Sequence, residues 1–179
     1  MEQIKREETK HGVYFANLSE YNNGRMVGGW LYPLDYDSLD SFYIAIKEVT
    51  RNADEVAVHD YDDFPDMGEY PDHDELFEVI HAVEDSHLDN EILFKYMANQ
   101  HDYSVDLVEE AENSYVTTCD SFSDFSDDYA DEQIMCNVNK EAQQFVFNNF
   151  DYKGYARDLE HSFYSFELST YEVAIFHQS

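Results

Sequence analysis

The chain has 179 residues, of which 40 are Asp or Glu and 10 are Lys or Arg, so its formal net charge at pH 7 is -30. A hydrophobic fraction of 43%, with 15 Tyr and 13 Phe, predicts a folded protein, because acidic disordered chains lack the apolar side chains that offset chain entropy. The charge excludes nucleic acid and anionic membranes as partners and favours cations, basic surfaces, or proteins whose usual ligand is a polyanion.

The first 61 residues predict a small ββαβ unit. Residues 21–24 are turn formers that tolerate positive φ and separate two segments of strand-forming residues. Gly28 and Gly29 in the second segment predict a bulge or a close backbone approach. Asp37 or Ser38 provides a capping side chain for the helix that follows. The expected elements are strands at 13–18, 26–32 and 55–61 and a helix at 37–49.

Two prolines and a glycine in residues 62–72 predict a boundary, after which the chain becomes mainly helical. The helix expected at 72–85 has an apolar face of Leu76, Phe77, Ile80 and Val83, and the helix expected at 89–99 has one of Ile92, Leu93, Tyr96 and Met97. The later expected elements are helices at 103–112, 122–135 and 141–148, a strand at 115–118, and a hairpin of 163–168 with 171–176. This succession predicts an α+β protein.

No motif for catalysis or cofactor binding occurs. The sequence has no phosphate-binding loop, no nucleophile elbow and no zinc-protease helix. A calcium-loop pattern begun at Asp60 or Asp124 lacks the required glycine and glutamate. A nuclease would need cations to hold phosphate, and Lys95 is the one basic residue in 52–139. We therefore expect no enzyme, no cofactor and no metal site.

Cys119 and Cys136 lie 17 positions apart and form no metal-binding pair. Two free thiols in a reducing cytoplasm are the expected state, and a single disulfide is the alternative. Residues 1–10 are polar, which predicts no signal peptide, and no apolar run approaches the roughly 20 residues of a membrane span. The expected location is the cytoplasm.

The negative charge is concentrated in the middle of the chain. Residues 1–51 have a net charge of -2, residues 52–139 a net charge of -25, and residues 140–179 a net charge of -3. Salt adaptation or general solubility would spread the acid over the whole surface. A localised polyanionic surface fits the distribution better, and a solubility face or a surface for a generic basic partner remains the alternative.

Several stretches, in a consistent order, resemble the ArdA antirestriction family. They are VYFANL at 13–18, YNNG at 21–24, GGWL at 28–31 with Pro33, HDY at 59–61, FP at 64–65, FDY at 150–152, YARDL at 155–159 and VAIF at 173–176. The resemblance extends from about residue 13 to residue 177. Residues 66–135 resemble the family in acidity more than in individual letters.

The resemblance implies an elongated, curved homodimer with three small domains in each chain. These would be an N-terminal α/β domain at 1–61, a central acidic helical domain at 62–102, and a C-terminal α+β domain at 103–179 that contains the dimer interface. It implies binding to the DNA site of a type I restriction–modification enzyme, formed by its methyltransferase core with its specificity subunit. Residues 120–132 resemble, by position, the family's antirestriction motif.

The expected DNA-mimicking surface consists of exposed carboxylates acting together. Carboxylates on helices, with a rise of about 1.5 Å per residue, can approach the density of about one charge per 1.7 Å along duplex DNA. The expected residues are Asp62, Asp63, Asp66, Asp74, Glu75, Glu78, Glu109, Glu110, Asp124, Asp127, Asp128 and Asp131. Alternatives are a mimic or chaperone directed at a nucleoid protein, another nuclease, a CRISPR effector or another basic protein.

Overall fold

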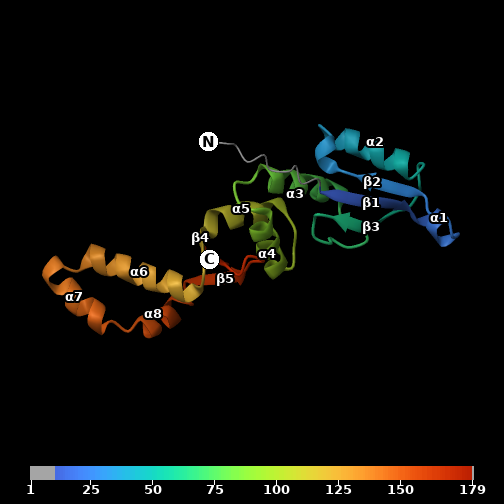
Figure 1. Ribbon diagram of the computed structural model, residues 1–179. Helices are drawn as coiled ribbons and strands as arrows, with labels where there is room; N and C mark the ends of the chain where they lie inside the picture. The colour runs from blue at the N-terminus through green and yellow to red at the C-terminus, as the bar shows by residue number, and fades with distance from the viewer. Residues whose placement is uncertain (1–10, 179) are drawn as a thin grey trace. The chain divides into compact units, whose positions relative to one another are not determined.

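The computed structural model describes residues 11–178 (Figure 1). Contacts divide the chain into two compact units. The first unit ends at Ser86 and also contains His101–Val108, and the second contains His87–Gln100 and continues from Glu109 to the C-terminus. The chain combines helices with two small sheets, one in each unit, so the predicted α+β class is confirmed. The division into three domains stays a prediction.

The first unit is built on an antiparallel sheet with the strand order β2-β1-β3. The strands are β1 (Gly12–Asn17), β2 (Gly28–Leu31) and β3 (Val56–Asp62). In the central strand, Val13 and Phe15 have no exposed surface. A Cβ atom on Gly28 would lie 2.2 Å from the Phe15 carbonyl oxygen, which confirms the expected close backbone approach.

The connection between β1 and β2 differs from the predicted simple turn. A short helix, α1 (Leu18–Asn22), follows β1 directly, and a positive φ comes later, at Gly24. The Asn17 side chain explains this helix, because its oxygen accepts a hydrogen bond from the Glu20 backbone N–H at 3.0 Å. The chain therefore makes one helical turn before it reverses, which the sequence-based prediction missed.

α2 (Leu39–Val49) packs its apolar side chains on this sheet, after the short 3-10 helix η1 (Pro33–Asp35). Ser38 caps the helix, as one of the two predicted caps, through reciprocal hydrogen bonds with Ser41. The buried residues of α2 are Phe42, Ala45 and Ile46. The Phe42 ring lies edge-on to the Phe15 ring, which joins helix and sheet in one core.

α3 (His73–Asp85) follows an irregular segment, as the prolines and glycine of residues 62–72 predict. Asp72 caps it by accepting hydrogen bonds from two backbone N–H groups of the first turn. The buried residues of α3 are Leu76, Val79, Ile80 and Val83. Phe77, which was expected to face inward, is half-buried, and its ring contacts those of Phe42 and His81.

The second unit contains the other antiparallel sheet, with the strand order β4-β6-β5. Its elements are α4 (Asn90–Gln100), β4 (Tyr115–Cys119), α6 (Phe122–Asn137), α7 (Lys140–Asn149), α8 (Tyr152–Leu159), β5 (Phe163–Glu167) and β6 (Val173–His177). α5 (Val105–Ser114) contains the boundary between the units. Every helix and strand predicted beyond residue 89 is present, with small shifts at the ends.

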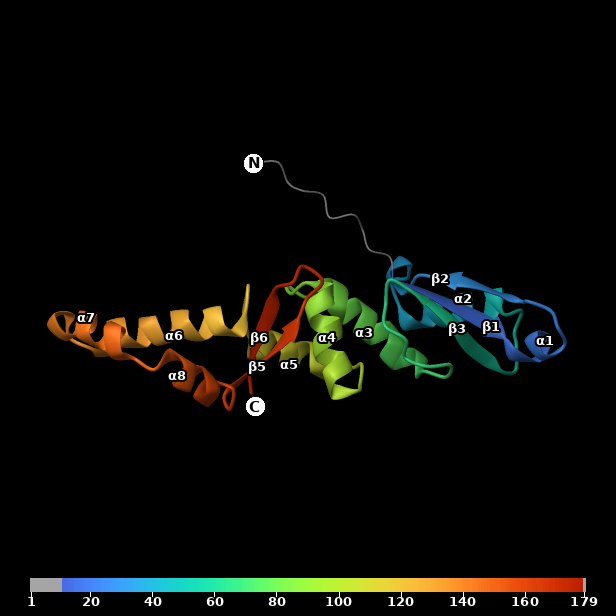
Figure 2. The same ribbon diagram turned by 60° about the horizontal axis from the view of Figure 1, so that its bottom comes forward.

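α8, like α1, is a helix that the sequence did not predict. It contains Gly154, a poor helix former, and Leu159 is its one fully buried side chain. Asp151 starts it by accepting a hydrogen bond from the Gly154 N–H at 3.0 Å. In Figures 1 and 2, α7 and α8 return along α6, so packing against α6 stabilises a segment whose local sequence is a weak helix former.

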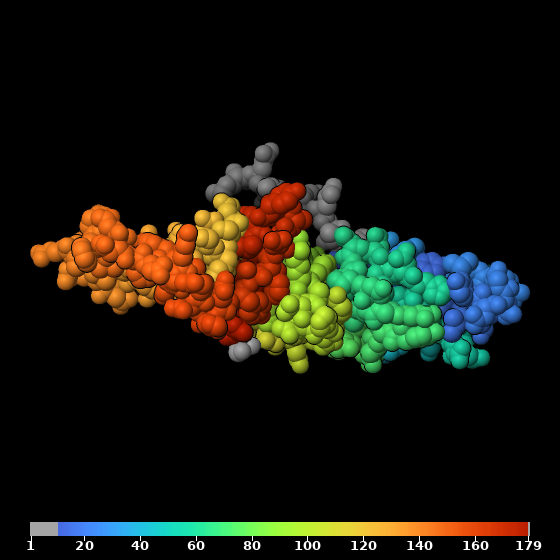
Figure 3. All heavy atoms as spheres, turned by 90° about the horizontal axis from the view of Figure 1, so that it is seen from below, coloured from blue at the N-terminus to red at the C-terminus, as the bar shows by residue number. Residues whose placement is uncertain are grey.

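The core of the second unit has one part in which Phe125, Leu159, Phe163 and Ile175 join α6, α8 and the C-terminal hairpin, and another part between α4 and that hairpin. The four α4 side chains predicted to face inward are all buried: Ile92, Leu93, Tyr96 and Met97. The ring centroids of Tyr96 and Phe176 are 4.9 Å apart. Glu91 accepts hydrogen bonds from the backbone N–H and the hydroxyl of Ser169 in the hairpin turn. Figure 3 shows the hairpin, in red, beside α4, in light green.

Three further expectations concern the cysteines, the membrane and the start of the chain. Cys119 and Cys136 are both free thiols. Within residues 11–178, no helix combines the length and the apolar character that crossing a bilayer requires. The expectation of no signal peptide rests on residues 1–10, which lie outside the described residues.

Candidate acidic binding surface

Eleven of the twelve predicted carboxylate residues are solvent-exposed, and Asp131 is half-buried. The acidic surface consists of Asp62, Asp63 and Asp66 at and after the end of β3, Asp74, Glu75 and Glu78 on α3, Glu109 and Glu110 on α5, and Asp124, Asp127, Asp128 and Asp131 on α6. The structure groups residues on α3 and on α6, where helical spacing brings carboxylates to one face. We call these twelve residues the acidic surface.

α6 presents a row of carboxylates opposite its apolar side. Its buried residues are Phe125, Ser126, Ala130 and Ile134. Side chains three or four positions apart share a helical face, so Asp124, Asp127, Asp128 and Asp131 form a row about 10 Å long. Asp124 alone lies in the first turn, where its negative charge interacts favourably with the helix dipole. Its Oδ2 accepts a hydrogen bond from Ser121 Oγ. The other three carboxylates repel one another, so they do not stabilise the helix.

Asp102 joins the carboxylates of α3, which the sequence did not predict. Asp66, Asp72, Glu75 and Asp102 line one cavity of about 280 Å³. Burial raises the pKa of Glu75, and the charges of Asp102, Asp72 and Glu78 raise it further. Glu75 and Asp102 are far apart in sequence and on different elements, so no local pattern could have paired them. This cavity is strongly anionic.

No residue of the acidic surface has a cationic partner within the described part of the chain. The ion pairs found in residues 11–178 join Arg25 to Glu20, Lys95 to Glu91, and His87 to Glu112. No ion pair within residues 11–178 therefore neutralises any of the carboxylates of the acidic surface. Their mutual repulsion opposes folding, and a cationic partner would relieve it.

Two residues of the acidic surface accept hydrogen bonds from tyrosine. Tyr43 Oη donates to Asp74 Oδ1, and Tyr152 Oη donates to Asp131 Oδ1, each at 2.5 Å. The hydrogen bond to the carboxylate favours the neutral phenol and raises the pKa of Tyr43 and of Tyr152 to about 12. These contacts fix the orientation of two carboxylates, and the one to Tyr152 joins α8 to α6.

The described residues contain no cluster of metal ligands. Within residues 11–178, no three His, Cys, Asp or Glu side chains converge on a point that could hold a metal ion. The carboxylates of the acidic surface are spread along helices and a loop. This arrangement suits contacts with an extended cationic surface better than coordination of one ion.

Comparison with protein-family models matches residues 13–172 to the family described as Antirestriction protein (ArdA). The chain belongs to the ArdA family. The match confirms the resemblance drawn from short stretches of sequence, and its range includes all twelve residues of the acidic surface. No individual curated protein matches the chain. Family membership makes the chain an antirestriction protein, an inhibitor with a restriction enzyme as its partner.

Proposed function

We propose that the protein blocks a type I restriction–modification enzyme by occupying the DNA-binding surface of its methyltransferase core and specificity subunit. The observation that supports this function is the acidic surface, whose carboxylates are exposed and have no cationic partner in residues 11–178. A DNA-binding groove is lined with Lys and Arg that neutralise phosphates. Rows of carboxylates such as the one on α6 offer that groove a similar density of charge.

Many weak contacts are expected to act together in this complex. A single exposed ion pair contributes about 0 to 1 kcal/mol, so no individual carboxylate is expected to decide binding. A homodimer would have twice the chain's charge of -30, which corresponds to the phosphates of about 30 base pairs. The proposal includes this homodimer, joined through the C-terminal domain, and action in the cytoplasm of the host cell.

A competition experiment tests the proposal. A purified type I enzyme is bound to a labelled duplex that contains its recognition site, and the protein is titrated at low and high salt. We expect displacement of the duplex near stoichiometry at low salt, and weaker displacement at high salt because ions screen the contacts. Absence of displacement at either salt concentration would contradict the proposal.

A second titration distinguishes a specific mimic from a general acidic partner. A nucleoid protein bound to the same labelled duplex replaces the restriction enzyme. We expect it to be displaced only at much higher concentration of the protein. Equal displacement from both proteins would contradict a specific complex and favour the alternative of a general partner for basic proteins.

A further inference from the structure

The first unit has a cavity of about 540 Å³ beside β3, and Asp66 is the one residue of the acidic surface that lines it. β3 lies at the edge of its sheet, and the chain after it folds back along it. The Val58 N–H donates to the Glu69 carbonyl oxygen at 2.9 Å, and Tyr61 Oη donates to the Gly68 carbonyl oxygen at 2.8 Å. These two hydrogen bonds close a loop that forms one wall of the cavity.

Aromatic side chains form the other part of the lining. Tyr21 from α1 and His59 from β3 lie edge to face, with ring centroids 4.6 Å apart, and Tyr61 lines the cavity beside them. Phe64, which is 8% exposed, also lines it. The HDY and FP stretches that the acidic-surface function leaves unexplained are therefore gathered at one cavity.

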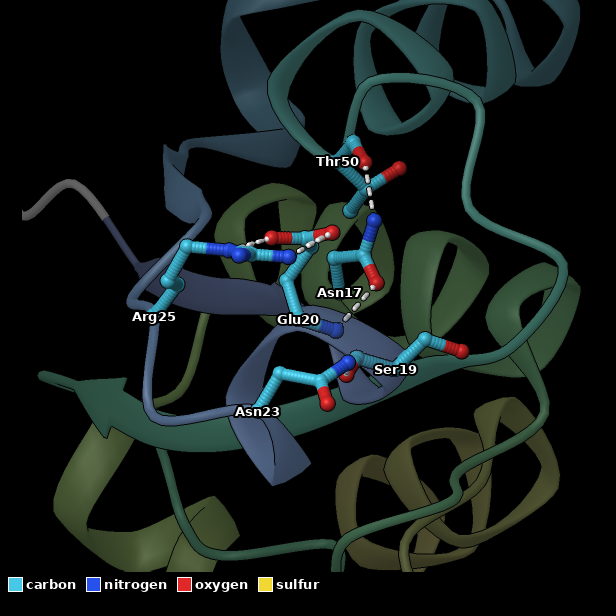
Figure 4. Close-up of polar contacts among 6 residues, drawn as sticks. All are labelled: Asn17, Ser19, Glu20, Asn23, Arg25 and Thr50. Atoms are coloured by element: carbon cyan, nitrogen blue, oxygen red, sulfur yellow. Dashed lines mark hydrogen bonds and ion pairs between the residues drawn. The ribbon is translucent and has the colours of Figure 1, made fainter.

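Tyr21 projects from a helix that is firmly anchored. Figure 4 shows that Asn17 Nδ2 donates to the Thr50 carbonyl oxygen at 2.9 Å while its side-chain oxygen caps α1. Arg25 forms two hydrogen bonds with the Glu20 carboxylate across the same turn. The Tyr21 side chain is nevertheless 48% exposed. A large ring held on a fixed helix and left open to solvent is available to a ligand.

The charge of the cavity selects a cation. Asp60, Asp66 and Glu69 line it, no Lys or Arg does, and none of the three carboxylates belongs to an ion pair in residues 11–178. Burial raises the pKa of Tyr61, and the nearby charge of Asp66 raises it further. Aromatic faces beside carboxylates bind an ammonium or guanidinium group and also contact its apolar stem.

We propose that this cavity binds the guanidinium or ammonium group of an Arg or Lys side chain of the protein partner. The inference rests on the proposed function, because a DNA-binding surface supplies such side chains. The carboxylates of the acidic surface other than Asp66 would meet cations in solvent, whereas this cavity would surround one cation with aromatic rings and with Asp60, Asp66 and Glu69. The cavity would add one localised contact, which we call the anchor, to the many weak ion pairs made by the acidic surface.

Substitution of the Tyr21 ring tests the anchor. Tyr21→Leu removes the aromatic face, Tyr21→Phe keeps it, and Tyr171→Leu changes a tyrosine that is 93% exposed and does not line the cavity. We expect the affinity for a purified type I enzyme to fall roughly 5-fold for Tyr21→Leu and less than about 2-fold for the other two variants. Equal affinities of Tyr21→Leu and Tyr171→Leu would overturn the inference, with thermal unfolding confirming that each variant folds.

A titration without the enzyme examines the cavity itself. Ethylguanidinium and the neutral propanol are added separately to the unaltered protein, and backbone amide shifts are followed by NMR. Saturable shifts at residues 58–61 and 66–69 with the cation alone would support the cavity as a cation site, and their absence would overturn it. Ethylguanidinium could cause shifts while Tyr21→Leu leaves the affinity for the enzyme unchanged. This outcome would overturn the inference that a side chain of the partner occupies the cavity and would assign the cavity to a free organic cation.

The affinity measurements and the NMR titration together distinguish the proposed function from the proposed cation site. Failure of the unaltered protein to bind the enzyme would contradict the proposed function. It would also contradict the inference that a side chain of this partner occupies the cavity. The NMR titration would then still decide whether the cavity binds a cation. Binding of the enzyme that is equally strong for all Tyr21 variants would leave the proposed function in place and remove the anchor.

Discussion

Helices α2 and α6 both bury an apolar side, yet their charges differ. α2 has Asp40 in its first turn and Lys47 in its last turn, which complement the helix dipole, and with Glu48 its two acidic residues and one basic residue give a net charge of only -1. α6 has five acidic residues in 16 and no basic one, and four of the five lie beyond its first turn. The charges of α2 are therefore those expected of a helix with no binding role, whereas most of the negative charge on α6 does not contribute to the stability of the helix.

On α6, the side chains that stabilise the fold and the side chains available for binding lie on different sides of the helix. Phe125, Ala130 and Ile134 hold α6 in place, while Asp127 and Asp128 face solvent. Removing the apolar side chains should destabilise the protein, and removing the carboxylates should leave it folded with weaker binding.

The largest effect is expected in the cores. Phe42 has no exposed surface and contacts the Phe15, Tyr36 and Phe77 rings, whereas Phe125 is 7% exposed. We expect Phe42→Ala to cost about 4 kcal/mol of unfolding free energy and Phe125→Ala about 3 kcal/mol, since both leave a void but the second lies nearer to solvent. Urea unfolding followed by circular dichroism measures both. A larger cost at Phe125 would contradict the ranking.

Neutralising three exposed carboxylates of α6, two from its row and the neighbouring Glu132, should weaken inhibition without unfolding the protein. In the triple variant Asp127→Asn, Asp128→Asn and Glu132→Gln, we expect DNA displacement from the enzyme to weaken on the order of tenfold, because several ion pairs of up to about 1 kcal/mol are lost together. The unfolding free energy should stay equal or rise, because like charges on one helical face repel. The competition titration measures the first effect and urea unfolding the second.

The matched control removes the same number of charges from the first 51 residues. Asp37→Asn, Asp40→Asn and Glu48→Gln change three exposed acids around α2. We expect less than a twofold change in DNA displacement. If this control weakened inhibition as much as the α6 variant, total charge rather than its location would determine binding, and the contrast between the helices would lose its functional meaning.

Periodicity and composition predicted the elements because both act locally. The four inward residues of α4 share one helical face, and all four are buried. The exposure of the acidic surface could be predicted because an unpaired carboxylate is costly to bury. Clusters of Asp and Glu with no cation nearby in the sequence are therefore expected to face solvent. α1 was not predicted because the turn-forming residues 21–24 overlap the end of the helix that Asn17 caps.

Contacts between distant segments could not be predicted in this way. Asp102 approaches Glu75 only after folding, and the cavity beside β3 depends on the hydrogen bond from Val58 to Glu69. α8 depends on packing against α6, since its own sequence contains Gly154. Each of these features requires the position of a second element, which the order of residues along one segment does not determine.

A smaller effect should appear in the salt dependence of stability. Salt screens repulsion among carboxylates, so we expect the Tm of the unaltered protein to rise by a few degrees between low and moderate salt. The α6 triple variant should rise less, because part of the repulsion has been removed. Differential scanning calorimetry at several salt concentrations measures this. An equal rise in the Tm of both proteins would mean that the repulsion arises from carboxylates outside α6.

The smallest effect is expected for Tyr43, which orients Asp74 by a hydrogen bond. Its pKa is raised from 10 to about 12, so the neutral phenol is favoured in the folded protein and the contact contributes fully below about pH 10. That contribution is lost as the pH rises through about 12. Tyr43→Phe should lower stability at neutral pH by less than about 1 kcal/mol, because the pair is exposed to solvent.

The pH profile of this variant distinguishes the hydrogen bond from simple packing of the ring. Between pH 10 and 12 the stability of the unaltered protein should fall more steeply than that of Tyr43→Phe, since the variant has no phenol to ionise at this position. Tyr171→Phe, whose ring is 93% exposed, is the matched control and should follow the unaltered protein at neutral pH. Parallel profiles for Tyr43→Phe and the unaltered protein would mean that Asp74 is positioned by the helix alone, like the freely exposed carboxylates of α6.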